Sequence, residues 1–284
     1  MVEQRQKAET LRALHSDSSP LVLVNVWDVA SALIIEEVGF AAIATTSAGI
    51  AFSKGYPDGQ KIHPDAMMAE VARIAEAVKV PVTADAEAGY GDSPDHAART
   101  ARLVIQAGAV GMNFEDATGR SDQPLMDQSL QVERIHAIRE AATKLGVPLV
   151  LNARTDVYLL QVGVPAKRYD EAVKRLGAYR DAGADCVFLP GVRDLPTIAR
   201  VVSDLGCPVN ILAGPGSPSI TELTAAGVKR ISLGSGPMRA TLGLLRRLAQ
   251  EVNAQGTYSL MDTSLSHAEI NQLMSATQDS QKKG

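Results

Sequence analysis

Three acidic residues stand at the ends of short apolar runs. Asp85 closes the run PVTAD, Glu87 follows two residues later, and Glu115 closes the run GMNFE. Side chains two residues apart in an extended chain point the same way, and carboxylates gathered without a cation resist ionisation. Mg²⁺ prefers carboxylate and water oxygens. We therefore predict that Asp85, Glu87 and Glu115 bind Mg²⁺, with Mn²⁺ as the alternative ion. The competing interpretation is that these acids cap helices or pair with Lys and Arg.

Arg154 is the basic counterpart of these acids. It ends the strand-like run PLVLNAR, where a planar guanidinium is suited to a carboxylate or a phosphate. The alternative is an ion pair with a neighbouring acid such as Glu115 or Asp156. Thr46, Ser47 and the backbone amides that follow them would add neutral donors. A cation and a guanidinium in one site favour a small chelating anion, for example a 2-oxo acid.

A repeated strand–helix unit must position these residues. Short apolar runs alternate with longer segments of helical spacing, which is typical of parallel strands joined by helical crossovers. The predicted strands cover 21–26, 41–45, 81–85, 111–115, 148–153, 186–189, 208–212 and 230–233. The predicted helices lie near 29–38, 65–79, 94–107, 129–145, 168–182, 193–205, 219–226 and 236–254. Eight units predict a (β/α)8 TIM barrel. An open doubly wound sheet is the alternative, but the turn VWDVAS lacks its glycine fingerprint.

The barrel is expected to fill residues 1–255 as one catalytic domain. Residues 256–284 are expected to add a C-terminal helix, near Ser266 to Met274, and a disordered polar tail. Two long connections, 46–63 and 116–128, follow the second and fourth strands and are typical of functional loops. Because the chemistry of a barrel gathers where its strands end, the acids and Arg154 should meet at that face.

Composition narrows the classes of function. The 284 residues include 28 Lys and Arg against 32 Asp and Glu, a net charge of −4, which argues against a nucleic-acid or membrane partner. No apolar run is long enough to span a bilayer, and the N-terminus lacks a signal-peptide pattern, so a cytoplasmic location is expected. Cys186 and Cys207 are expected as buried reduced thiols rather than as a disulfide. The Gly-rich turns at 213–218 and 233–236 leave a sugar-phosphate enzyme as an alternative.

At these residues the chain resembles the isocitrate lyase and phosphoenolpyruvate mutase superfamily. The resemblance covers roughly residues 15–255 and includes VNVWDVASALIIEEVGFAAIATTSAGIA, GYPDG, PVTADAEAGYGD, AGAVGMNFEDATG, VLNARTD and PVNILAGPGSPS. It implies a (β/α)8 barrel whose last helix is swapped between subunits. The resemblance also implies that the protein forms a homo-oligomer, either a dimer or a tetramer.

The resemblance also assigns roles to individual residues. It implies that Asp85, Glu87 and Glu115 form the Mg²⁺ shell, with Asp58 of the GYPDG turn close to the metal. The remaining residues would bind the substrate. Thr46, Ser47 and Ala48 match a segment whose amides hold a carboxylate, Arg154 reaches the same anion, Asn210 lines the pocket and Trp27 is a candidate wall.

Four positions depart from the pattern of the superfamily. The loop after the fourth strand, ATGRSDQPLMD, lacks the cysteine of lyases that cleave isocitrate or methylisocitrate. Asn113 stands where His is frequent, Gly191 where Glu is usual, and Glu87 where Asp is usual. Arg120, with Ser121 and Asp122, is therefore the candidate proton donor on this loop.

These observations predict a Mg²⁺-dependent enzyme of small 2-oxo or 2-hydroxy carboxylates. It would break or form a C–C bond through an enolate, with a C–P bond as the less favoured case. Typical cleavage of isocitrate or methylisocitrate is not expected, because the loop lacks the cysteine. The first alternative is an oxaloacetate-type decarboxylase or hydrolase. The second is a 2-oxo acid binding protein with little turnover.

Overall fold

A parallel β-sheet forms the centre of the molecule in the computed structural model, which describes the backbone of residues 2–281 and the side chains of residues 2–275. The sheet order is β1-β9-β8-β7-β6-β5-β4-β3-β2. The strands are β1 Leu21–Leu23, β2 Asn25–Val26, β3 Ile43–Thr45, β4 Val82–Asp85, β5 Gly111–Glu115, β6 Val150–Arg154, β7 Cys186–Phe188, β8 Val209–Leu212 and β9 Arg230–Ser232.

The two edges of this sheet belong to one stretch of chain. β1 pairs with β9 and β2 pairs with β3, both in parallel, and one residue, Val24, separates β1 from β2. The predicted strand 21–26 is therefore two short strands, and the sheet is nearly closed. This arrangement is an α/β barrel-like fold with C-terminal helices, and all eight predicted strand regions contain a strand.

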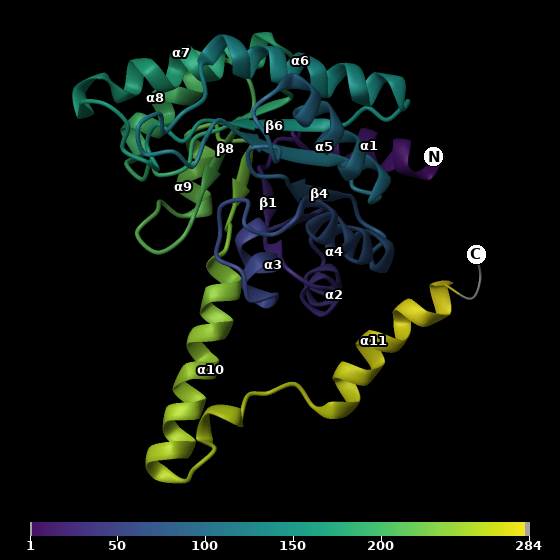
Figure 1. The fold of residues 1–284 in the computed structure, drawn as a ribbon. Coiled ribbons are helices and arrows are strands. Elements are labelled where there is room, and N and C mark those ends of the chain that lie inside the picture. Colours follow the sequence, from purple (N-terminus) through teal and green to yellow (C-terminus); the bar gives the residue numbers. More distant parts are fainter. Residues whose placement is uncertain (1, 282–284) are drawn as a thin grey trace.

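Helices follow the strands and surround the sheet (Figure 1). Their bounds are α1 Val2–Leu14, α2 Val29–Glu37, α3 Ser47–Ser53, α4 Pro64–Ala77, α5 Pro94–Gln106, α6 Gln128–Lys144, α7 Arg168–Asp181, α8 Leu195–Leu205, α9 Ile220–Ala225, α10 Gly236–Gln255 and α11 His267–Gln281. Two short 3₁₀ helices, η1 Pro165–Lys167 and η2 Ser259–Met261, lie in connections. Side-chain caps fix several starts: Asp28 accepts from the Ser31 amide at α2, and Ser93 from the His96 amide at α5.

Three segments differ from the sequence prediction. The connection 46–63 is not irregular throughout, because α3 occupies its first part with Thr46 as the N-cap. The connection 116–128 is pinned by an antiparallel bridge between Ala117 and Leu125. The last helix does not end near Met274 but continues to Gln281, and the disorder of the tail stays a prediction. Residues 282–284 of the tail lie outside the described residues.

The C-terminal residues 236–281 form an arm that projects from the barrel. Figure 1 shows α10 projecting away from the sheet, with α11 returning toward α2. Glu251 fixes the turn between them, since its carboxylate accepts hydrogen bonds from the Thr257 hydroxyl, from the Ser259 amide and hydroxyl, and from the Leu260 amide. These bonds hold the pKa of Glu251 down at about 2. The swap of this arm between subunits stays a prediction.

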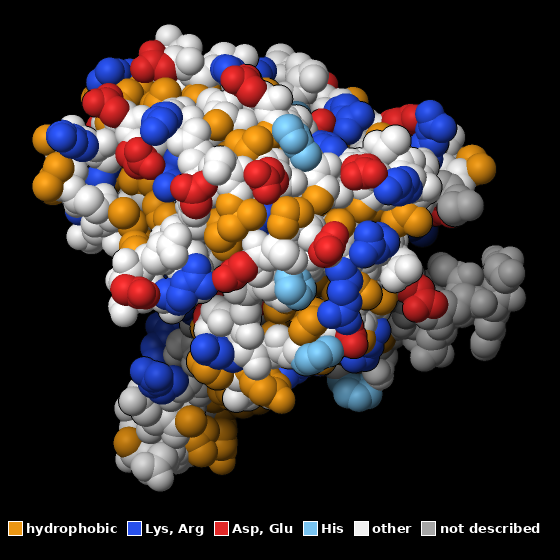
Figure 2. Space-filling view, turned by 45° about the horizontal axis from the view of Figure 1, so that its top comes forward, with side chains coloured by type: hydrophobic (Ala, Val, Ile, Leu, Met, Phe, Trp, Pro, Cys, Tyr) orange, Lys and Arg blue, Asp and Glu red, His pale blue; other side chains and the backbone are white. Residues whose placement is uncertain are grey.

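The surface carries charges of both signs. On the face drawn in Figure 2, Lys and Arg side chains lie among Asp and Glu side chains. Within residues 2–281 we find no helix that combines the length and apolarity needed to cross a bilayer. Both cysteines are free thiols; Cys186 is buried as expected, whereas Cys207 is only half-buried.

Candidate active site

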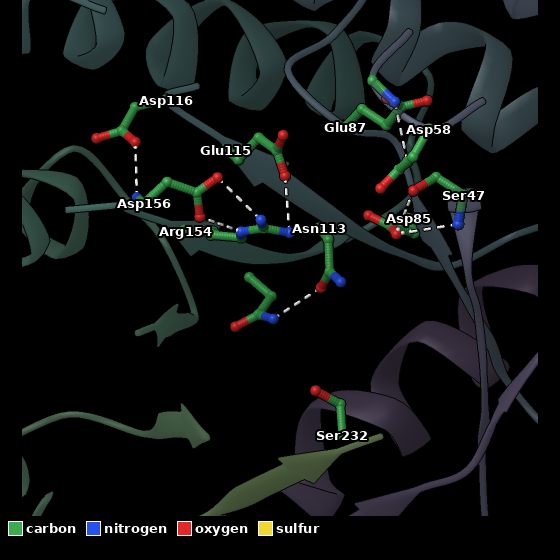
Figure 3. Close-up of polar contacts among 12 residues, drawn as sticks. Ser47, Asp58, Asp85, Glu87, Asn113, Glu115, Asp116, Arg154, Asp156 and Ser232 are labelled. Carbon is green, nitrogen blue, oxygen red and sulfur yellow. Dashed lines mark hydrogen bonds and ion pairs between the residues drawn. The ribbon is translucent and has the colours of Figure 1, made fainter. Parts of the chain in front are cut away.

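A cavity of about 360 Å³ opens where the strands end. Its walls come from strands β2 to β9 and the connections that follow them, as expected for the catalytic face of a barrel. The lining includes Asn25, Thr46, Ser47, Ala48, Asp58, Asp85, Asn113, Arg154, Phe188, Gly191, Arg193, Ser232, Ser235 and Arg239. Figure 3 shows two polar groups in this region, one around Asp85 and the other around Arg154.

Asp85, the last residue of β4, has one oxygen free. Its Oδ2 accepts hydrogen bonds from the Ser47 amide at 3.0 Å and the Ser47 hydroxyl at 2.7 Å. Its own amide donates to the Thr45 hydroxyl at 3.0 Å, which fixes the strand end. The other oxygen, Oδ1, is buried and has no hydrogen-bond partner. A buried carboxylate oxygen without a donor is costly, so Asp85 is prepared for a cation.

Glu87 is held by a different part of the chain. One carboxylate oxygen accepts from the backbone amide of Gln60, and the other accepts from the Tyr90 hydroxyl at 3.2 Å. The Gln60 side-chain oxygen accepts in turn from the Tyr90 amide at 2.6 Å. Burial, followed by the charge of Asp85, raises the pKa of Glu87 to about 7. Glu87 therefore joins two loops.

Arg154, the last residue of β6, lies between two acids (Figure 3). Its Nη1 is 2.8 Å from Glu115 Oε2, and Nε and Nη2 donate to Asp156 at 2.5 and 2.9 Å. Burial alone would lower the pKa of Arg154, but these two carboxylates raise it. Burial raises the pKa of Glu115, and Arg154 opposes that rise. Both ion pairs that the sequence left open are present.

A buried acid behind Arg154 fixes the end of β6. Asp116 is fully buried and accepts hydrogen bonds from the Thr155 hydroxyl at 2.7 Å, the Asp156 amide at 2.9 Å and the Tyr179 hydroxyl at 2.7 Å. Arg175 also approaches its carboxylate, at 3.2 Å. Because Asp116 fixes the backbone of Asp156, it also fixes the carboxylate that orients Arg154.

The acids suit a divalent cation, although they do not form a complete ligand cluster. Burial, with a contribution from Asp85, raises the pKa of Asp58, as expected where like charges meet. Among residues 2–281 no group of three or more His, Cys, Asp and Glu residues is arranged to hold a metal, because Glu87 and Glu115 are engaged elsewhere. Mg²⁺ usually binds through one or two carboxylates and keeps several waters. Asp85 and Asp58, which both line the cavity, supply that number of carboxylates.

The other predicted site residues fall in four places. Thr46, Ser47 and Ala48 line the cavity. Asn210 is buried behind the wall, where it exchanges hydrogen bonds with Ser232. Trp27 lines a separate apolar cavity between α2 and α10, of about 300 Å³. Among the loop candidates, Arg120 pairs with Asp92 at 2.7 Å, and Ser121 and Asp122 are exposed.

Four residues that the sequence interpretation did not assign take part in the site. Arg193 and Arg239 line the cavity near the Gly-rich turns. Both follow a strand end within a few residues, and that position could have identified them from the sequence. Gln60 and Tyr90 hold Glu87. With Glu87 they are three of the four non-glycine residues with positive φ in the described chain, at 59°, 56° and 48°, a conformation that sequence spacing does not reveal.

Two positions that depart from the superfamily pattern, Asn113 and Gly191, line the cavity. Asn113 Oδ1 accepts from Asn152 Nδ2 at 2.7 Å and from the buried Arg230 at 3.1 Å. Gly191 has φ of +93°, and a Cβ there would lie 2.9 Å from the backbone nitrogen of Leu159. A glutamate at position 191 would therefore require the backbone to shift.

Comparisons with known sequences identify relatives over most of the chain. Residues 11–253 match the family model described as phosphoenolpyruvate phosphomutase. The chain is 38% identical over 240 residues to the uncharacterized protein Rv1998c of Mycobacterium tuberculosis, covering 84% of this chain and 87% of that protein. It is 27% identical to the 2-methylisocitrate lyase of Escherichia coli (92% and 90% covered) and 28% identical to an oxaloacetate decarboxylase of Rhodopseudomonas palustris (81% and 78% covered).

Solved structures give the same assignment. A Burkholderia cenocepacia protein described as a lyase or mutase is 42% identical, with a TM-score of 0.91 and 96% and 97% of the two chains covered. 2,3-Dimethylmalate lyase is 30% identical, with a TM-score of 0.83 and 98% and 99% covered. Oxaloacetate acetylhydrolase, solved with its product oxalate, is 25% identical, with a TM-score of 0.85 and 98% of both chains covered. The chain belongs to the phosphoenolpyruvate mutase and isocitrate lyase superfamily, whose members include lyases, decarboxylases and hydrolases.

Proposed function

We propose that this protein is a Mg²⁺-dependent enzyme of small 2-oxo or 2-hydroxy carboxylates. It would break or form a C–C bond beside the carbonyl, with a C–P bond as the less favoured case. The observation that carries the proposal is the buried, unpartnered Oδ1 of Asp85 in the same cavity as the guanidinium of Arg154. A cation ligand and an anion-binding group in one cavity suit a ligand with a carboxylate next to an oxo group.

Each side chain has a physical task in this proposal. Asp85, with Asp58, would hold the ion, and Glu87 and Glu115 would add negative charge around it. Bound Mg²⁺ would act as a Lewis acid on the 2-oxo group. Arg154 would bind the substrate carboxylate and stabilise negative charge that develops on the neighbouring oxygen. Ser47 would orient Asp85, because its amide and hydroxyl both donate to that carboxylate.

The loop after β5 bears on the choice of reaction. Its candidate donor Arg120 pairs with Asp92 and has a half-exposed side chain, and the loop has no cysteine or histidine. Decarboxylation of an oxaloacetate-like acid needs least from this loop, because CO₂ leaves without a general base. An oxaloacetate-type decarboxylase or hydrolase is therefore the alternative enzyme, and relatives of both kinds exist.

A substrate screen tests the proposal. Purified protein would be assayed with Mg²⁺, and separately with Mn²⁺, against oxaloacetate, phosphonopyruvate and 2,3-dimethylmalate. We expect metal-dependent product from at least one acid, loss of that activity in Asp85→Asn, and retention in the matched control Asp95→Asn, an exposed acid in the first turn of α5. Saturable oxalate binding without product would instead support a binding protein with little turnover.

We also propose that the protein is a homo-oligomer, either a dimer or a tetramer. The arm carries large exposed apolar side chains: Leu242, Leu244, Leu245, Val252, Tyr258, Met261 and Leu265. Figure 2 shows hydrophobic side chains on the projecting arm. Exposed apolar side chains gathered on one part of the surface are typical of a protein–protein contact, and a second copy of this chain is the partner that the superfamily membership favours.

A further inference from the structure

The segment that carries Asp58 is a loop whose middle depends on a few contacts. This Asp58 loop covers residues 54–63, between α3 and α4. At its start Lys54 pairs with Glu70 at 2.9 Å, and at its end Ile62 is buried. Asp58 itself is exposed at the mouth of the cavity. Between these ends Gln60 bonds the loop to the turn between β4 and α5.

Gln60 is held from two sides. The backbone amide of Gln60 donates to the carboxylate of Glu87, and its side-chain oxygen accepts from the backbone amide of Tyr90 at 2.6 Å. The Tyr90 hydroxyl donates to the second oxygen of Glu87 at 3.2 Å, which closes a ring of three residues. This ring joins the Asp58 loop to the turn between β4 and α5.

All three residues of the ring have left-handed backbone conformations. Their φ angles are 59° for Gln60, 48° for Glu87 and 56° for Tyr90. Non-glycine residues keep such conformations only where surrounding interactions enforce them. The three bonds connect these residues to one another, and the Glu115 amide also donates to the Glu87 carbonyl at 3.1 Å, so the ring contributes to holding these conformations.

Glu87 and Asp85 differ in what their oxygens do. Both oxygens of Glu87 accept from protein donors, whereas Oδ1 of Asp85 has no partner. Asp85 and Asp58 line the cavity, and Glu87, which is 4% exposed, lies outside its lining. The side chain of glutamate is one methylene longer than that of aspartate. That additional length places the carboxylate against Gln60 and Tyr90.

We propose that Glu87 is a positioning residue that latches the Asp58 loop to the barrel, and that it does not ligate the metal directly. Through Gln60, it keeps Asp58 at the mouth of the cavity. The inference rests on the proposed function for the role of Asp58 beside the metal. The latch itself is independent of the reaction that the enzyme catalyses.

Two measurements on the full-length protein test this assignment. Hydrogen exchange detected by mass spectrometry would follow the peptide over residues 54–63, with a β5 peptide as the internal reference. Titration with Mn²⁺, detected by electron paramagnetic resonance, would report metal affinity without an assay of activity. The variants are Glu87→Gln, Glu87→Asp and Tyr90→Phe for the latch, and Asp85→Asn for the metal ligand.

We expect the latch variants to act on the loop first and on the metal only through it. Loss of a hydrogen bond to a charged group should speed exchange of the 54–63 peptide about tenfold, with the β5 peptide unchanged. The Mn²⁺ dissociation constant should rise less than in Asp85→Asn, because the direct ligand remains. Glu87→Asp separates charge from reach, because it keeps the carboxylate but is too short for the ring. Glu87→Gln with Tyr90→Phe should exchange no faster than the more affected single variant, since both break one ring.

Other outcomes would overturn the inference. If Glu87→Gln weakened Mn²⁺ binding as much as Asp85→Asn and left loop exchange unchanged, Glu87 would be a ligand and not a latch. If the β5 peptide exchanged faster together with the loop, the effect would be general destabilisation. If wild type bound no Mn²⁺, the metal in the proposed function would be refuted, while loop exchange would still decide the latch.

Discussion

Replacement of Arg154 by alanine is the most informative single change. Its guanidinium makes three close contacts, one with Glu115 and two with Asp156, and it stacks over Phe188 with 5.6 Å from Cζ to the ring centroid. Arg154→Ala would leave two carboxylates near each other without their cation. Asp156 is 2% exposed, and Arg154 is its only ion-pair partner in the described part of the chain.

The expected magnitude follows from those contacts. Removal of one partner from a buried ion pair costs about 3–5 kcal/mol of folding free energy, because an uncompensated charge remains. If most of that cost comes from the remaining carboxylates, a second change that neutralises one of them should restore part of it. Arg154→Ala with Glu115→Gln should therefore be more stable than Arg154→Ala alone, by about 1–2 kcal/mol.

Two assays check this reasoning. Urea unfolding would give the free energies of the single and double variants, and calorimetric titration with oxalate in Mg²⁺ would give the affinity. We expect Arg154→Ala to weaken oxalate binding by about 2–5 kcal/mol. A double variant less stable than Arg154→Ala would refute the origin assigned to the folding cost. Unchanged oxalate affinity would return Arg154 to a purely structural role.

Three further predictions concern other parts of the molecule. Burial and the charge of Arg230 lower the pKa of His15 to about 4. The stability contributed by neutral His15 is therefore complete above about pH 6.5 and is lost as pH falls toward 4, a change on the order of 3 kcal/mol. Unfolding curves of His15→Gln should lack this pH dependence. Leu245→Lys should reduce the sedimenting mass if the arm forms the subunit contact, and an unchanged mass would exclude that face. Gly191→Ala should cost about 1–3 kcal/mol, because its Cβ meets the backbone of Leu159. In the control Gly119→Ala, which also has positive φ but open space, thermal unfolding should show a smaller loss.

Much of the fold could be predicted because apolar runs and turn residues encode it directly. The strand predicted at 111–115 has the bounds of β5, and that at 81–85 differs from β4 by one residue. The break at Val24 could not be seen in a continuous apolar run, since it depends on which neighbouring strand each half pairs with. The helix α3 was missed because SAGIAFS has little helical periodicity, although Thr46 is a favourable N-cap.

The site was predictable in its members but not in its pairings. Strand ends identified Asp85, Glu115 and Arg154, because residue type and position suffice for that. The sequence could not decide whether Arg154 binds Glu115 or Asp156, since its fork reaches both once β5 and β6 are in register. The engagement of Glu87 by Gln60 was hidden for another reason: it depends on left-handed conformations in two loops that spacing does not report.

The cavity residue Asn113 has a consequence for proton transfer. Its amide oxygen is saturated by Asn152 and by the buried Arg230, so its amino group is the part left to face a ligand. A carboxamide donates a hydrogen bond but gives up no proton at neutral pH. An anion that contacts this amide would accept a hydrogen bond there without receiving a proton, so the proton that quenches it would have to come from another group.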